Sequence, residues 1–190
     1  MILIALATNT HVSELSTRWL HRLGFAPRDL LRLQWGRMLT SALLTSGGTS
    51  FWLSLAMVLI AVGAAEWLAG TRRAGCTFWG VHLLTLLLEA WIIAVPLRLY
   101  DGALGAALSV ARDVGPSAGY FGCLGLACAR LPGRWRWLSA AIWAALWATL
   151  WLPGGIGHAR TLAISASLAH VIAFPLGWIA ARVPLQRKRR

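Results

Sequence analysis

Two residues in the second half of the chain, Ser117 and His170, could together perform nucleophilic catalysis. Pro116 suits the first turn of a helix and leaves Ser117 at the helix N-terminus. Free backbone amides and the positive end of the helix dipole can stabilise an anion there, such as the oxyanion of a tetrahedral intermediate. A histidine within hydrogen-bonding reach would act as the general base for the serine hydroxyl. The two residues therefore predict a serine–histidine dyad, provided that the elements carrying them are neighbours.

Small residues indicate how those two elements could meet. Segment 113–125 reads Asp-Val-Gly-Pro-Ser-Ala-Gly-Tyr-Phe-Gly-Cys-Leu-Gly, with a glycine at every third position from Gly119 to Gly125. The helical face that contains His170 has Phe174 as its bulky member, and its other residues are small: Ala163, Ala166, Ala173, Gly177 and Ala181. Missing side chains allow two helices to approach closely. The alternative stays open, because a serine at a helix start is commonly a cap and a histidine in a span is commonly a packed polar residue.

The composition indicates that both helices lie in a membrane. Of the 190 residues, 58% are hydrophobic and only 13% are charged, whereas soluble domains are roughly 45–50% apolar. Four apolar runs, at 51–70, 76–97, 137–153 and 161–181, approach or exceed the ~17–25 residues of a membrane-spanning helix. A shorter glycine-rich run at 115–129 supplies a fifth span. The sequence therefore predicts an all-α, polytopic membrane helix bundle with five to six transmembrane helices.

The formal charge of +12 does not indicate a nucleic-acid-binding protein, because the 18 lysines and arginines lie mainly in connections and at the C-terminus. Gly-Arg-Trp-Arg at 133–136 and Arg-Lys-Arg-Arg at 187–190 adjoin hydrophobic ends, where cations reach lipid headgroups. By the positive-inside rule both segments are cytoplasmic. We therefore expect membrane lipids as partners, no nucleic acid, and a cytoplasmic C-terminus.

Three regions are expected along the chain. Residues 1–37 form a short N-terminal hydrophobic stub and an interfacial segment, in which the mixture of arginines and bulky apolar residues at 13–37 suits helices in the interface plane or, equally, a partly ordered loop. Residues 38–182 form the transmembrane core, within which 98–114 predicts a long loop because Asp101, Gly102, Gly105 and Asp113 interrupt it. Residues 183–190 form a basic cytoplasmic tail.

Other polar and aromatic side chains in the apolar runs carry weaker signals. His82 and Glu89 are two turns apart and project from one face of the 76–97 helix. Such groups need partners or water, so they either line a polar cavity or, as we favour, form an internal structural contact. A stripe of tryptophans at helical spacing favours lipid contact or helix packing over a binding platform: Trp143, Trp147 and Trp151. No metal is expected, because no His-Glu-x-x-His helix is present, and no cofactor is expected either.

Four stretches follow one another in a recognisable order. They are Gln-Trp-Gly-Arg-Met-Leu-Thr-Ser-Ala at 34–42, Gly63-x-x-Glu66-x-x-x-Gly70, Gly-Pro-Ser-Ala-Gly-Tyr-Phe-Gly at 115–122, and Ala-His-Val-Ile-Ala-Phe-Pro-Leu-Gly at 169–177. Together they resemble the rhomboid family over most of the chain. The resemblance is greatest to a divergent actinobacterial-type group of rhomboid-like proteins, which share Thr-Asn-x-His (here at 8–11), an early histidine in a later helix (here His82) and Asp-Val-Gly before the serine.

The resemblance implies an intramembrane serine endopeptidase of a bacterial plasma membrane, which cleaves transmembrane-helix clients with Ser117 as nucleophile and His170 as general base. Three departures from the family pattern are present. Ala118 replaces the glycine after the nucleophile, Ser50 and Ser54 stand where the family has a histidine and an asparagine near the oxyanion, and a complete first helix is missing. The two serines are auxiliary oxyanion candidates, and loss of one donor typically costs about 100- to 1000-fold in rate. The alternative is a catalytically inactive rhomboid-fold pseudoprotease that binds membrane proteins or lipids.

Overall fold

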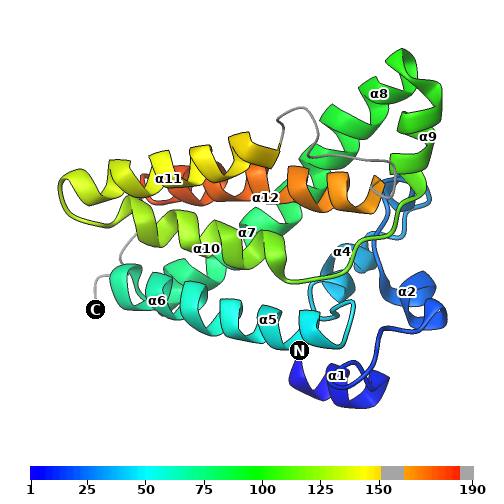
Figure 1. Ribbon diagram of the computed structural model, residues 1–190, viewed down its shortest axis with the longest axis horizontal. Helices are drawn as coiled ribbons and strands as arrows, with labels where there is room; N and C mark the ends of the chain where they lie inside the picture. Colours follow the sequence, from blue (N-terminus) through cyan, green and yellow to red (C-terminus); the bar gives the residue numbers. More distant parts are fainter. Residues whose placement is uncertain (151–160, 185–190) are drawn as a thin grey trace.

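The computed structural model describes residues 1–150 and 161–184, which form helices joined by short connections (Figure 1). The described residues contain two isolated β-bridges and no longer strand, so the expectation of an all-α protein is confirmed. The helices, with η1 and η2 as π-helical segments, are in chain order α1 (Ile2–Thr8), α2 (Thr17–Leu23), α3 (Arg28–Leu31), α4 (Gly36–Ser41), α5 (Thr49–Met57), η1 (Val58–Val62), α6 (Gly63–Ala69), α7 (Thr71–Leu88), η2 (Glu89–Ala94), α8 (Val95–Tyr100), α9 (Gly102–Val110), α10 (Ser117–Ala129), α11 (Arg134–Leu150) and α12 (Thr161–Ala180).

One continuous helix, made of α5, η1 and α6, covers Thr49–Ala69 and corresponds to the run predicted at 51–70. In the described part of the chain it is the one helix that is long and apolar enough to cross a membrane. Only 17% of its apolar window is buried in the protein, which is unlike the core helix of a soluble domain. A shorter apolar helix, Ala166–Ala180, forms most of α12. The further predicted spans rest on the sequence, and residues 151–153 lie outside the described residues.

Helix α10 lies between α12, α7 and α6 and packs against all three. Its glycines permit this close packing. A Cβ at Gly125 would collide with the carbonyl oxygen of Phe174, and a Cβ at Gly177 would collide with the carbonyl oxygen of Gly122. Gly122 also faces Val81 of α7, which a Cβ would meet at 2.6 Å. The backbones of α10 and α12 are therefore in direct contact, which is the neighbour relation that a Ser117–His170 dyad requires.

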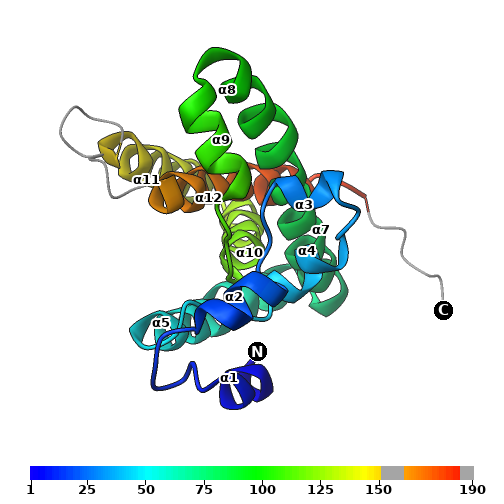
Figure 2. The same cartoon turned by 90° about the vertical axis from the view of Figure 1, so that its right-hand side faces the viewer.

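The segment at 13–37 is partly helical, because it contains α2 and α3 and leads into α4 (Figure 2). Helix α2 packs against α4, and α4 packs against α7. Phe25 and Leu30 are buried in one cluster with Met38 and with Leu86 of α7. Short helices and the residues between them therefore pack on α7.

The prediction of a long loop at 98–114 is wrong for most of its length, because α8 ends at Tyr100 and α9 occupies Gly102–Val110. The Asp101 side chain caps α9 by accepting hydrogen bonds from the amides of Ala103 at 3.1 Å and Leu104 at 3.0 Å. The alanines and leucines of α9 are strong helix formers and outweigh its two glycines. Figures 1 and 2 show α8 and α9 side by side, projecting from the rest of the bundle.

Candidate active site

An open cavity of about 660 Å³ lies beside the N-terminal end of α10. Residues of the N-terminal segment, α5, the connection before α10, α10 itself and α12 line it. Four of the predicted site residues lie together on its wall: Ser117, His170, Ser50 and Ser54. The cavity therefore unites side chains that are more than a hundred residues apart in the sequence.

Ser117 is the first residue of α10, and it is half-buried. Gly115 has a φ of +145°, a backbone conformation that side-chain-bearing residues rarely adopt. The amide of Gly115 donates a hydrogen bond of 2.9 Å to the carbonyl oxygen of Ser41, which fixes the chain just before the serine. Amides in the first turn of a helix have no acceptor within that helix. Donors that could stabilise an oxyanion therefore lie beside the Ser117 hydroxyl.

His170 extends from α12, and its imidazole is held by two aromatic rings. The ring centroid of Phe121 is 4.4 Å away, and that of Trp147 is 5.5 Å away in an edge-on arrangement. Nε2 of His170 is buried and has no hydrogen-bond partner among the described residues, so it is not bonded to the Ser117 hydroxyl. Catalytic hydrogen bonds are often long or absent without substrate and tighten in the complex. The Ser117 hydroxyl and the His170 imidazole thus line the same cavity without a hydrogen bond between them. The rings of Phe121 and Trp147 restrain the plane of the imidazole.

Two tryptophans of α11, Trp143 and Trp147, are half-buried and contact aromatic rings of α12. Trp143 stacks on Phe174 of α12, with ring centroids 4.4 Å apart and planes at 14°, and Trp147 borders His170 as described above. For these two residues the contacts agree with helix packing, one of the roles that the sequence favoured over a binding platform. Trp151 lies outside the described residues. The spacing of these tryptophans is visible in the sequence, but the contact between Trp147 and the His170 imidazole is visible only in the structure.

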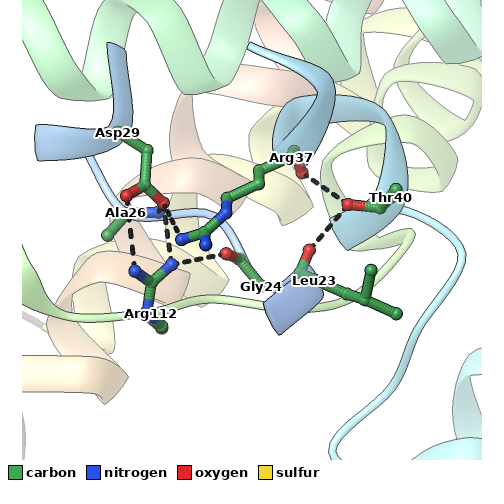
Figure 3. A network of polar contacts seen from close by, with 7 residues as sticks. All are labelled: Leu23, Gly24, Ala26, Asp29, Arg37, Thr40 and Arg112. Carbon is green, nitrogen blue, oxygen red and sulfur yellow. Dashed lines mark hydrogen bonds and ion pairs between the residues drawn. The ribbon is translucent and has the colours of Figure 1, made fainter. Parts of the chain in front are cut away.

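A buried ion-pair network holds the connection that leads into Ser117 (Figure 3). The carboxylate of Asp29, fully buried on α3, accepts hydrogen bonds from Arg112 at 2.7 and 3.3 Å, from Arg37 at 3.2 Å and from the amide of Ala26 at 3.1 Å. Arg112 also donates to the carbonyl oxygen of Gly24 at 2.7 Å. Burial of the Asp29 carboxylate opposes its ionisation, but these donors outweigh burial and lower its pKa. The network bonds Arg112, which directly precedes the segment 113–117 that leads to the serine, to the N-terminal segment.

A backbone pairing reinforces this attachment. Phe25 and Asp113 exchange two hydrogen bonds, of 3.1 Å from the Phe25 amide and 2.8 Å from the Asp113 amide. Residues 112, 113 and 115 are therefore each bonded to the segment at 24–41. Sequence reasoning did not find this support. The signal that could have indicated it is the presence of Asp29, Arg37 and Arg112 in a chain with few charged residues.

The auxiliary candidates Ser50 and Ser54 extend from α5 into the same cavity, with Ser50 exposed and Ser54 half-buried. Ser54 of α5 and Tyr120 in the first turn of α10 both line the cavity, so these two helices form neighbouring parts of its wall. Ala118 is buried with Val81 and Ala173 and is not among the residues that line the cavity. Ala118 can contribute only its backbone amide to an oxyanion.

His82 and Glu89 are buried and lie away from this cavity, since neither is among its lining residues. Nε2 of His82 lies 2.8 Å from the carbonyl oxygen of Met38, which links α7 to α4. That bond agrees with the structural contact favoured for His82. The Glu89 side chain is buried at the start of η2.

Asp113 gives the site a testable pH dependence. Burial raises its pKa from 3.8 to about 6, although a hydrogen bond from the Val114 amide opposes the rise. An acid whose pKa rises on folding binds protons more tightly in the folded state, so stability falls as pH rises from about 4 to about 6.

We expect the Asp113→Asn variant to lose this decrease in stability. The change in unfolding temperature between pH 4.5 and pH 7, measured in detergent, should differ between the wild type and Asp113→Asn by a few degrees. An equal change in the two proteins would contradict the raised pKa of Asp113. Asp29 does not interfere, because its contribution is lost only as pH falls below 3.8.

No protein-family model, curated protein or solved structure matches this chain. The functional assignment therefore depends on the geometry of the cavity and on the sequence motifs.

Proposed function

We propose that the protein is a rhomboid-like intramembrane serine endopeptidase that cleaves transmembrane-helix clients through a Ser117–His170 dyad. One observation carries the proposal: the serine at the N-terminus of α10 and the histidine of the adjoining helix α12 line the same open cavity. Direct contact between the two helix backbones limits how far these side chains can separate. Ser50 and Ser54, the positions aligned with the oxyanion residues of the family, lie on the same wall.

The membrane location in this proposal is supported by exposed apolar surface. Leu59 is 68% exposed and Trp67 is 88% exposed on the helix Thr49–Ala69, and contiguous apolar surface of this kind needs a partner or a lipid phase. We place five or six spans in the bilayer, with the C-terminus in the cytoplasm. In Figure 1 the end of α6 and the α10–α11 connection lie at one end of the bundle, and Arg73 and Arg130 both bond Ala181, directly after α12. Six arginines belong to the segments at that end, which supports a cytoplasmic location by the positive-inside rule: Arg72, Arg73, Arg130, Arg134, Arg136 and Arg182.

The proposed reaction follows from the positions of these groups. The Ser117 oxygen attacks the carbonyl carbon of a client peptide bond while His170 accepts the hydroxyl proton. Amides in the first turn of α10, with the hydroxyls of Ser50 and Ser54, donate to the oxyanion. The imidazolium then protonates the leaving amine as the C–N bond breaks. Water hydrolyses the acyl-enzyme with His170 again as base, and polar lining groups such as Asp113 favour its presence in the cavity.

A second candidate function is the catalytically inactive rhomboid-fold pseudoprotease. Among the described residues, Nε2 of His170 has no hydrogen-bond partner and is not bonded to Ser117, which favours this function, as do the altered residues at 50 and 54. In that case the cavity holds a client without cutting it, and the Ser117→Ala variant retains the biological role.

A cleavage assay in proteoliposomes separates the two functions. The purified chain is reconstituted with a panel of single-span reporter proteins, and products are identified by mass spectrometry. We expect cleavage within or beside the reporter's transmembrane segment, reduced at least about 10⁴-fold in Ser117→Ala. Ser109→Ala is the matched control, because its hydroxyl bonds Ala106 on α9, away from the cavity. Equal cleavage by the wild type and Ser117→Ala would contradict the dyad.

A further inference from the structure

A second groove lies between α7 and α12 and has a different character from the Ser117 cavity. Its volume is about 350 Å³, and the two cavities share no lining residue. Gly80 and Leu84 of α7 line it together with Leu176 and Ile179 of α12. Leu84 and Ile179 are exposed, and Arg73 borders the same groove. The groove is therefore apolar along the two helices and cationic at one end.

Two guanidinium groups converge at that end. Arg73 donates hydrogen bonds to the carbonyl oxygens of Ala181 at 3.1 Å and Val183 at 2.7 Å, and Arg130 donates to the same Ala181 oxygen at 2.9 Å. Neither arginine forms an ion pair with a carboxylate among the described residues, where the ion pairs are those of Asp29. The C-terminal dipole of α12 offers only about half a negative charge. The two positive charges that share one acceptor are thus incompletely neutralised. Because each guanidinium has five N–H donors, Arg73 and Arg130 retain donors for a further anion.

The groove also has the length of one leaflet. Helical rise places Leu84 about 16 Å from Arg73 along α7, and the hydrocarbon core of a bilayer is about 30 Å thick. An acyl chain lying from Arg73 toward Leu84 would therefore reach about the middle of the membrane. A headgroup phosphate at the arginine end would then lie at the cytoplasmic surface, where anionic lipids are concentrated.

We propose that this groove binds one anionic glycerophospholipid, with its phosphate on Arg73 and Arg130 and one acyl chain along α7 and α12. The inference rests on the membrane location proposed above, but not on catalysis. Basic pockets between transmembrane helices on the cytoplasmic side are a known way to hold such headgroups. Because α12 also carries His170, the bound lipid holds the cytoplasmic end of the helix on which the imidazole lies.

Native mass spectrometry of the full, delipidated chain in detergent tests the charge requirement. The protein is titrated with dioleoylphosphatidylglycerol and, separately, with dioleoylphosphatidylcholine. We expect one phosphatidylglycerol to bind at least about tenfold more tightly than phosphatidylcholine. The double variant Arg73→Gln/Arg130→Gln should lose that preference. Arg136→Gln is the matched control, since Arg136 is exposed and donates to the carbonyl oxygen of Gly133, whereas Arg130 shares the Ala181 oxygen with Arg73. Equal binding of both lipids by the wild type would overturn the proposal.

Two glycines on α7 test the acyl-chain requirement without removing charge. A Cβ at either Gly80 or Gly75 meets no atom within 4 Å, so leucine fits at both positions, but only Gly80 lines the groove. Gly80→Leu should therefore weaken phosphatidylglycerol binding about tenfold or more, while Gly75→Leu should bind like the wild type. Unchanged binding by Gly80→Leu, or displacement of the lipid by inorganic phosphate alone, would overturn the lipid groove.

Two readouts separate this inference from the proposed function. The chain should resist alkaline carbonate extraction from membranes, and release would contradict the membrane location itself. Fluorophosphonate labelling of Ser117 should persist in Gly80→Leu. A membrane-embedded, labelled protein without phosphatidylglycerol preference would overturn the lipid site alone.

Discussion

Replacing His170 with alanine is expected to stop client cleavage as completely as replacing Ser117, and the double variant should be no slower than either single variant. A serine hydroxyl at neutral pH is a weak nucleophile until a base removes its proton, so either loss disables the same step. Catalytic groups that act as a unit show such non-additive effects. Each single variant should lose on the order of 10⁴-fold or more in rate.

The measurement is the initial cleavage rate of one reporter in proteoliposomes for the wild type, the two single variants and the double variant. His21→Ala is the matched control, because His21 is exposed on α2 and does not line the cavity. Losses that multiply in the double variant would mean that the two residues act independently. The dyad would then be wrong, even though both residues line the cavity.

Replacing Asp29 with alanine is expected to destabilise the folded protein by about 3–5 kcal/mol, because it leaves buried positive charge without its partner. Arg112 is the more affected partner, since its side chain is 7% exposed while that of Arg37 is 21% exposed. Arg112→Gln should therefore cost more stability than Arg37→Gln. Reporter cleavage should also fall in the folded fraction of Asp29→Ala, because Arg112 precedes the segment that carries Ser117.

Unfolding free energies in detergent provide the comparison. Asp101→Ala is the matched control, because it removes an exposed carboxylate that caps α9 and should cost about 1 kcal/mol. If Asp29→Ala costs no more than Asp101→Ala, the network does not stabilise the fold as argued. The anchoring of the Ser117 connection would then depend on the backbone bonds of Asp113 and Gly115 alone.

The features that could be predicted from the sequence are those with a local or periodic signal. The run at 51–70 forms the continuous helix Thr49–Ala69, because length and apolar composition suffice to identify such a helix. The glycines of α10 and Gly177 of α12 mark the helix faces that meet, because only backbone can approach backbone so closely. That close approach is also why Ser117 and His170 share a cavity.

The features that sequence reasoning missed depend on contacts between distant residues. Asp29 and Arg112 are 83 residues apart, and no periodicity relates them. The pairing of Phe25 with Asp113 has the same character. The helix α9 differs for another reason: glycine and aspartate are typical of loops, but here Asp101 is the cap that starts the helix.

Labelling with a fluorophosphonate probe tests the central claim most directly, because it needs no knowledge of the client. The purified protein in detergent is compared with Ser117→Ala, His170→Ala and the control Ser109→Ala. The dyad predicts labelling of the wild type and of Ser109→Ala, with loss of labelling in both Ser117→Ala and His170→Ala. A well-folded wild type that does not label, or labelling that persists in Ser117→Ala, would contradict the dyad and favour the client-binding pseudoprotease.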